Sequence, residues 1–273
     1  MNHDRRLTPA TERVALDSLR GKLDRPEYTA GEPARMAVPL ADLMSAPDGH
    51  RDRQVIFGAD LTVIERRDGW AFVQAALDGY CGWLPEETLS PELPPITHRV
   101  TAPATHLYPA ADMKQPEICM LSIGARLAVE GTEGRFARLV TGGYVPLQHI
   151  DDRPVRDPVE LAETLLGTPY LWGGNSRSGL DCSALVQIAL TACGIPCPGD
   201  SDLQRDAFPE AEQIRRGDLL FWPGHVALAV SADLMIHATA WKMAVIRENI
   251  PDAIARIDAA SDGPFLGIRR PGG

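Results

Sequence analysis

The chain has 273 residues, of which 44% are hydrophobic and 23% are charged, as in an ordinary globular protein. Its formal net charge of −10 argues against nucleic acid and other anionic polymers as main partners. No stretch reaches the roughly 20 apolar residues of a membrane-spanning helix, and no apolar region follows the charged N-terminal residues. If the chain is complete, we expect a cytoplasmic protein of two or three domains with no membrane partner.

Five cysteines make an odd number without regular spacing, which is typical of reduced thiols. Cys193 and Cys197 are close enough in sequence to suggest metal ligands, but no second close pair completes a tetrahedral set. We therefore expect these two cysteines to be packing residues, and we expect no metal and no organic cofactor.

Residues 1–35 are predicted to form an N-terminal arm. Prolines and a glycine interrupt the segment, and the one short helix that we expect lies around Glu12–Leu23. We interpret the arm as a structural element on the surface of the domains, with Tyr28 as the side chain that could reach a groove.

The next part of the chain contains an internal repeat of short alternating strands separated by glycine turns. Three segments each have a later counterpart: 58–65 with 124–130, 69–73 with 134–139, and 79–85 with 143–146. This pattern predicts two small all-β barrels, over 36–92 and 93–152, with the proline-rich segment 91–95 as the stiff linker between them. The first copy, with G-W-x-x-V and then G-Y-x-G-W-L, resembles bacterial SH3-like domains, whereas the second lacks the final G-W.

Residues 153–273 are predicted to form a third module. Asp157 and Pro158 are a helix N-cap and first position, and Gly167 ends that helix. A loop rich in glycine and small polar residues begins at Tyr170 and runs into an apolar helix that Asp181 caps and Gly194 ends.

Cys182 is expected in the first turn of this apolar helix. There the unpaired N–H groups and the helix dipole favour an anion, which predicts a lowered thiol pKa and a nucleophile at neutral pH. The alternative is that Cys182 is a small buried hydrophobic residue.

Two histidines follow on neighbouring strands. His225 begins the predicted strand 224–230 and His237 lies in the strand 234–238, with the short turn 231–233 between them. The strands are expected to pair antiparallel, which would bring the two imidazoles together. A thiol, an imidazole and an orienting third group form an activated nucleophile.

The motifs Y-x-W-G-G…D-C-S, G-D-L-L-F-W, G-H-V-A-L-A-V and I-H-A occur in this order and resemble the NlpC-type family of bacterial cell-wall cysteine peptidases. The resemblance covers roughly residues 155–270. It implies an α+β class with a reduced papain-like fold, in which a helix bearing the cysteine packs on an antiparallel sheet. The family's usual D-C-S-G is D-C-S-A here, and Ala184 keeps a small residue.

By this resemblance Cys182 is the nucleophile, His225 the base and His237 the orienting residue. Tyr170 would line the site and help to hold the oxyanion, with plain packing as the alternative. Asp181 and Ser183 would bind the ammonium of the substrate in addition to their roles at the helix start.

The barrels have two interpretations, docking to the cell wall or completion of the substrate pocket, and the acidic charge counts against the first. For the second, Tyr80 and Trp83 are the candidate aromatic residues, with barrel core as the equal alternative. In the branch of the family with two SH3-like domains, the first supplies an aromatic and an acidic residue that recognise the free amino terminus of the substrate. Tyr80 is the candidate for the aromatic residue, and neither Asp60 nor Glu65 matches the acidic one clearly.

The resemblance therefore implies a cysteine endopeptidase that cleaves the bond between γ-D-glutamate and a diamino acid in peptidoglycan stem peptides with a free N-terminal L-Ala. The expected partner is this small peptide, L-Ala-γ-D-Glu-diamino acid, and the expected role is muropeptide recycling. An amidase or acyltransferase of the same fold is one alternative. A non-catalytic cell-wall fragment binding protein is the other, and the intact Cys182, His225 and His237 argue against it.

Overall fold

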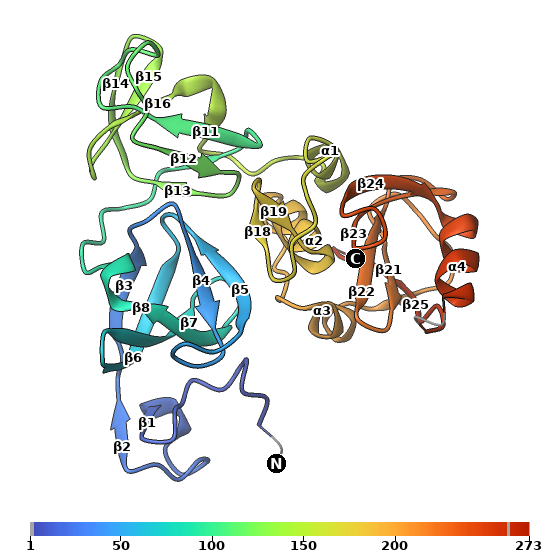
Figure 1. The fold of residues 1–273 in the computed structure, drawn as a ribbon, viewed down its shortest axis with the longest axis horizontal. Helices are drawn as coiled ribbons and strands as arrows, with labels where there is room; N and C mark the ends of the chain where they lie inside the picture. The colour runs from blue at the N-terminus through green and yellow to red at the C-terminus, as the bar shows by residue number, and fades with distance from the viewer. Residues whose placement is uncertain (1–2, 261–262, 273) are drawn as a thin grey trace. The chain divides into compact units, whose positions relative to one another are not determined.

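The computed structural model describes residues 3–260 and 263–272. The chain divides into two compact units (Figure 1). The N-terminal unit contains the described residues up to Val100 together with Ala104–Asp152, and the C-terminal unit contains Thr101–Pro103 and the described residues from Arg153 onward.

The first barrel of the N-terminal unit is a curved antiparallel sheet with the strand order β5-β4-β8-β7-β6-β3-β9. Its strands are β3 (Glu32–Met36), β4 (Leu40–Met44), β5 (Arg51–Ile56), β6 (Asp60–Arg67), β7 (Trp70–Ala75), β8 (Cys81–Pro85) and β9 (Leu89–Ser90), with a 3-10 turn at Glu86–Thr88. Because β3 starts at Glu32, the barrel begins inside the segment that the sequence assigned to the arm.

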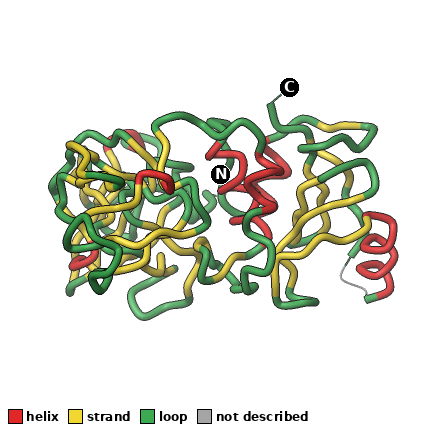
Figure 2. Tube along the Cα trace, turned by 90° about the horizontal axis from the view of Figure 1, so that it is seen from above, coloured by secondary structure: helices red, strands yellow, loops and turns green. Residues whose placement is uncertain are grey.

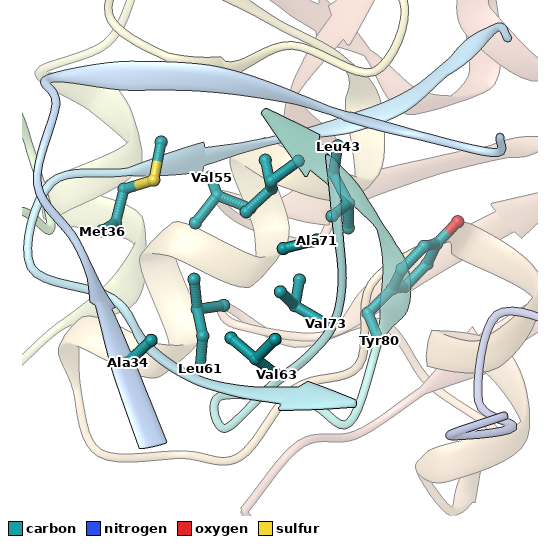
Figure 3. Close-up of a cluster of buried hydrophobic side chains, with 10 residues drawn as sticks. Ala34, Met36, Leu43, Val55, Leu61, Val63, Ala71, Val73 and Tyr80 are labelled. Carbon is teal, nitrogen blue, oxygen red and sulfur yellow. The ribbon is translucent and has the colours of Figure 1, made fainter. Parts of the chain in front are cut away.

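The barrel core contains mostly aliphatic side chains that come from the strands β3 to β8 (Figure 3). Met36, Leu43 and Val73 are each at most 1% exposed, so their burial supplies hydrophobic stabilisation of about 1.5–3 kcal/mol per large side chain. Tyr80 packs at the edge of this cluster, and its hydroxyl points away from the aliphatic side chains (Figure 3).

The second β domain repeats the strand order of the first. Its strands are β10 (His98–Val100), β11 (Ala104–Leu107), β12 (Cys119–Ser122), β13 (Arg126–Leu127), β14 (Val129–Glu133), β15 (Phe136–Leu139), β16 (Tyr144–Pro146) and β17 (Ile150–Asp151), with a 3-10 turn at Leu147–His149. β10 pairs with β13 and β17 as β3 pairs with β6 and β9, and β14-β15-β16 repeats β6-β7-β8. The paired strands form three short sheets instead of one continuous sheet.

The repeated glycines have a conformational reason. Gly58 and Gly124 precede the equivalent strands β6 and β13 with φ of 78° and 84°, a left-handed region that favours glycine. At Gly58 a Cβ would also collide with the backbone of Arg126. Arg126 joins the two β domains, because its N–H donates to the Phe57 carbonyl at 3.1 Å and its guanidinium lies 2.6 Å from Asp60.

The N-terminal arm differs from its prediction. The expected helix is limited to a 3-10 turn at Asp17–Leu19, between the strands β1 (Val14–Leu16) and β2 (Glu27–Thr29), which pair in parallel. Val14 is 7% exposed and packs with side chains of the first barrel, so burial favours an extended strand over the helix. The hydroxyl of Tyr28 donates to the Leu23 carbonyl at 2.6 Å, which gives this residue a role inside the arm.

The C-terminal unit has a six-stranded sheet with the order β20-β25-β21-β22-β23-β24, and its central helix α2 and the last helix α4 lie on opposite faces of that sheet (Figures 1 and 2). The strands are β20 (Glu210–Ala211), β21 (Leu219–Trp222), β22 (His225–Ala229), β23 (Leu234–Thr239), β24 (Ala244–Asn249) and β25 (Gly267–Arg269). The helices are α1 (Pro158–Glu163), α2 (Cys182–Ala192), α3 (Ser201–Ala207) and α4 (Ile250–Ala259). The strands β18 (Asn175–Ser176) and β19 (Gly179–Leu180) form a small antiparallel hairpin.

The predicted helix starts of this unit are confirmed. The Asp157 carboxylate accepts a hydrogen bond from the Val159 N–H at 2.8 Å, and Pro158 is the first residue of α1. The helix itself ends at Glu163, earlier than predicted, and a turn continues the chain to Gly167, whose φ is 77°. Within the described ranges no helix is long and apolar enough to cross a membrane.

Candidate active site

The loop before α2 places Cys182 at the first position of that helix. Asp181 is the N-cap, and its Oδ1 accepts from the Ala184 N–H at 2.7 Å and from the Ser183 hydroxyl at 2.9 Å. Its Oδ2 accepts from the Gly173 N–H at 3.0 Å, so one carboxylate fixes both the loop and the helix start. The roles of Asp181 and Ser183 at the helix start are thus visible in the structure.

The glycines of this loop allow close packing. A Cβ at Gly174 would meet the backbone of Gly179, and a Cβ at Gly179 would meet the side chain of Leu171. Only glycine fits at both positions, which holds the loop against the β18–β19 hairpin and fixes the entry of the chain into α2.

The sulfur of Cys182 lies against the start of β22. Its Sγ is 3.9 Å from the Gly224 carbonyl oxygen, and the backbone N–H of Val226 is close enough to lower the thiol pKa. Gly224 and Val226 are the residues on either side of His225, so the sulfur contacts the backbone next to the predicted base. The structure therefore brings together the thiol and the strand that carries the imidazole.

The predicted lowering of the Cys182 pKa is wrong for the resting site. The residue is 7% exposed, and burial, with the charge of Asp181, raises the pKa of its thiol to about 12. The N–H groups of Val226, Ser183 and Cys182 act in the opposite direction, as expected at a helix start, but burial outweighs them. At neutral pH the thiol is thus protonated before a substrate enters.

His225 and His237 meet where their strands separate. β22 and β23 are paired at Leu228 with Ile236 and at Ala229 with Met235, and the two imidazoles lie beyond this pairing, with His225 Nε2 2.8 Å from His237 Nδ1. The predicted antiparallel hairpin is confirmed, and so is the contact between the two rings. Since Nε2 of His225 faces His237, we expect Nδ1 to be the nitrogen that receives a proton from Cys182.

The imidazole of His225 is neutral in the resting site. Its pKa is lowered from 6.5 to about 3, mainly by burial and to a lesser extent by His237 and Arg256, while the carboxylate of Glu248 acts in the opposite direction. A neutral imidazole has a free lone pair, so His225 is ready to act as a general base.

Sequence reasoning missed two residues behind His237. His237 is 0% exposed, and its Nε2 lies 3.0 Å from Oε2 of Glu248 in β24. Arg256 of α4 binds the same carboxylate with two hydrogen bonds of 2.8 Å each. The alternating pattern of β24 could have suggested that Glu248 shares a face with Ile246, but only the packing of α4 reveals Arg256.

Tyr170 lies beside the nucleophile. Burial raises the pKa of its hydroxyl, and the charges of Cys182 and Asp181 raise it further, so the phenol is a neutral hydrogen-bond donor close to both groups. Its backbone N–H donates to the Met243 carbonyl at 2.9 Å, and Tyr170 forms an isolated parallel β-bridge with Leu180. These contacts are compatible with the predicted role in holding an oxyanion.

The two candidate aromatic residues of the first barrel pack against other side chains of their own unit. Tyr80 is 2% exposed and packs in the barrel core, and Trp83 is 6% exposed with its ring 5.3 Å from that of Phe72. This burial supports the barrel-core alternative for both aromatic residues.

The two acidic side chains considered for the barrel also have partners there. Asp60 pairs with Arg35 and Arg126, each at 2.6 Å, and Glu65 lies 3.6 Å from Arg13 of the arm. These ion pairs give both carboxylates a structural role inside the N-terminal unit.

The described residues contain no group of three or more His, Cys, Asp and Glu side chains arranged to hold a metal ion. Cys193 is half-buried and Cys197 is buried, and neither forms a disulfide.

Comparisons with known proteins find matches within both units. Residues 167–255, which include Cys182, His225 and His237, match the NlpC/P60 family, and residues 43–89 match the bacterial dipeptidyl-peptidase Sh3 domain. Dipeptidyl-peptidase 6 of Lysinibacillus sphaericus is 28% identical over 235 residues, which cover 73% of this chain and 85% of that protein. A gamma-D-glutamyl-L-lysine dipeptidyl-peptidase of Bacillus subtilis (strain 168) is 28% identical over 68% of this chain and 71% of that protein.

A solved structure agrees with these matches. The crystal structure of an NlpC/P60 family protein from Bacillus cereus ATCC 10987 superimposes with a TM-score of 0.74 at 21% identity, over 88% of this chain and 99% of that chain. The α+β papain-like fold is therefore confirmed, as is an SH3-like domain before it. The second β domain stays a predicted SH3-like barrel, supported by its strand order.

Proposed function

We propose that this chain, which carries an NlpC/P60 peptidase domain behind a bacterial dipeptidyl-peptidase Sh3 domain, is a cysteine peptidase that hydrolyses peptides derived from peptidoglycan. The observation that carries the proposal is the position of the Cys182 sulfur against Gly224 and Val226, the two neighbours of His225. A helix-start thiol beside a neutral, oriented imidazole is the arrangement that acyl transfer through sulfur requires.

The reaction begins from two neutral groups. As Sγ of Cys182 forms a bond to the carbonyl carbon of the substrate, its proton passes to His225, which becomes an imidazolium. The negative charge on the carbonyl oxygen faces the N–H groups at the start of α2 and the hydroxyl of Tyr170. The imidazolium then gives its proton to the leaving amine, and the C–N bond breaks to leave a thioester on Cys182.

Hydrolysis of the thioester repeats these roles in reverse. His225, neutral again, takes a proton from water as the water oxygen attacks the thioester carbon. The C–S bond breaks, the sulfur takes back the proton from His225, and the carboxylic acid product leaves. No other group is needed to balance the protons.

The finer substrate is also a proposal: the bond between γ-D-glutamate and a diamino acid, in short stem peptides with a free N-terminal L-Ala. The names of the two relatives, dipeptidyl-peptidase 6 and gamma-D-glutamyl-L-lysine dipeptidyl-peptidase, support this choice. The carboxylate of Asp181, one residue from the nucleophile, would attract the substrate ammonium. We also propose that the source of this peptide is soluble muropeptides released for recycling.

The test uses L-Ala-γ-D-Glu-L-Lys and L-Ala-γ-D-Glu-diaminopimelate, each with a free and an acetylated amino terminus. Mass spectrometry is expected to show release of L-Ala-D-Glu from the free peptides and little or none from the acetylated ones. Equal cleavage of both forms would remove the amino-terminus proposal. No hydrolysis, with transfer of the acyl group to an added amine, would favour an acyltransferase.

A further inference from the structure

A chain of polar side chains continues beyond the residues that the mechanism uses. His237 of β23 contacts Glu248 of β24, Glu248 is bound by Arg256 of α4, and the Arg256 guanidinium lies 4.2 Å from the centroid of the Trp241 ring. Two strands of the sheet and the helix that covers it thus place charged or titratable side chains around one carboxylate. The reaction needs no atom of Glu248, so its position needs another explanation.

The two hydrogen bonds from Arg256 fix the plane of the carboxylate. Both oxygens of Glu248 accept from the guanidinium, at 2.8 Å each, and one of them also faces His237 at 3.0 Å. That oxygen lies off the axis of the ring N–H, so the contact with His237 is an ion-pair distance and not a linear hydrogen bond. Burial alone would raise the pKa of Glu248, but the contact with His237 and the hydrogen bonds from Arg256 lower it to about 2, so the carboxylate is ionised at neutral pH.

An ionised carboxylate only accepts, so it determines where the proton of His237 lies. A carboxylate oxygen 3.0 Å from Nε2 favours a proton on that nitrogen over a lone pair, so a His237 ring that carries one proton holds it on Nε2 and has an acceptor at Nδ1. The 2.8 Å contact then requires a proton on Nε2 of His225. The free lone pair of His225 is thereby on Nδ1, the nitrogen left for Cys182.

We propose that Glu248, held by Arg256, is a positioning residue that acts through His237 to fix the tautomer of His225 in which Nδ1 is the base. The proposal rests on the proposed cysteine peptidase function for its catalytic consequence. The positions of the two protons, on Nε2 of His237 and on Nε2 of His225, follow from the contacts and do not depend on that function.

Two charged groups beyond the histidine pair act on the imidazole of His225: Glu248 from β24 and Arg256 from α4. The charges of Glu248 and Arg256 act on His225 in opposite directions. Removal of the carboxylate alone would leave the guanidinium, which disfavours the imidazolium that the reaction forms.

The first test is Glu248→Gln, in which a neutral amide can present either its oxygen or its nitrogen to His237. We expect kcat to fall at least about tenfold, within the roughly 10²–10⁴-fold contribution of a general base, with KM little changed. Glu248→Asp keeps the charge and is expected to recover part of this loss. Glu163→Gln is the matched control, because Glu163 pairs with Arg247, the neighbour of Glu248 on β24. Its activity should equal that of the unchanged protein.

The second test needs no turnover and no variant at Glu248. Nitrogen-15 NMR of the histidines in the unchanged protein, assigned with His225→Gln and His237→Gln, is expected to show both rings protonated on Nε2. A proton on Nδ1 of His237 would overturn the proposal, even if the protein hydrolyses the peptide. If the protons are as expected but no peptide is cleaved, the proposed function fails and the positioning role stands. An unchanged kcat in folded Glu248→Gln would also overturn the proposal.

Discussion

The Cys182→Ala protein is expected to lose peptide hydrolysis by at least about 10⁴-fold, because the sulfur forms the bond that replaces the peptide bond. The loss should appear in kcat, with substrate binding retained, since alanine removes no group that contacts the substrate before attack. We expect the fold to persist, because the thiol donates to the Gly224 carbonyl across a long 3.9 Å contact and alanine also fits the first turn of a helix. Release of L-Ala-D-Glu measured by mass spectrometry, together with a thermal unfolding curve, checks both parts.

Cys193→Ala is the matched control for this variant. Cys193 is the C-cap of the same helix, α2, and is also a free cysteine, but it lies at the end opposite to the site. Its activity is expected to match that of the unchanged protein. Turnover in folded Cys182→Ala, or its loss in folded Cys193→Ala, would show that the nucleophile has been assigned to the wrong residue.

The second largest effect is expected for His225→Gln, which removes the proton acceptor. We expect kcat/KM to fall by roughly 10²–10⁴-fold, the usual contribution of a general base. His106→Gln, at an exposed histidine of the second β domain, should change nothing. Retention of full activity by folded His225→Gln would contradict the mechanism.

The pH dependence of the unchanged protein follows from the burial of His225. The neutral form of the imidazole is the base, and this form predominates above its pKa. Burial lowers that pKa from 6.5 to about 3, so loss of activity through protonation of His225 is expected only at strongly acidic pH. A plot of kcat/KM against pH, limited to values at which the protein remains folded, would show this shift.

The site was largely predictable because its parts are local in sequence. The capping bond of Asp181, the first-turn position of Cys182 and the hairpin of His225 and His237 each depend on residues within one short segment. The pKa of Cys182 could not be predicted in the same way. The helix start is visible in the sequence, but the burial that outweighs it is a property of the packed chain.

The parts that were missed depend on contacts between distant segments. Glu248 reaches His237 through the pairing of β23 with β24, and Arg256 reaches Glu248 because α4 covers that face of the sheet. The arm shows the same limit, since Val14 lies in an extended strand that packs on the first barrel where local sequence suggested a helix. For Tyr80 and Trp83, the pattern located a strand and its turn but not the side on which each ring packs.

A reactive substrate analogue would show directly whether Cys182, activated by His225, is the nucleophile. A diazomethyl ketone of L-Ala-γ-D-Glu places an electrophilic carbon where the scissile carbonyl would lie, and peptide mapping by mass spectrometry then identifies the labelled residue. We expect a label on Cys182 alone among the five cysteines, and its loss in His225→Gln. Label on another residue, or none on Cys182 in a protein that cleaves the free peptide, would contradict it.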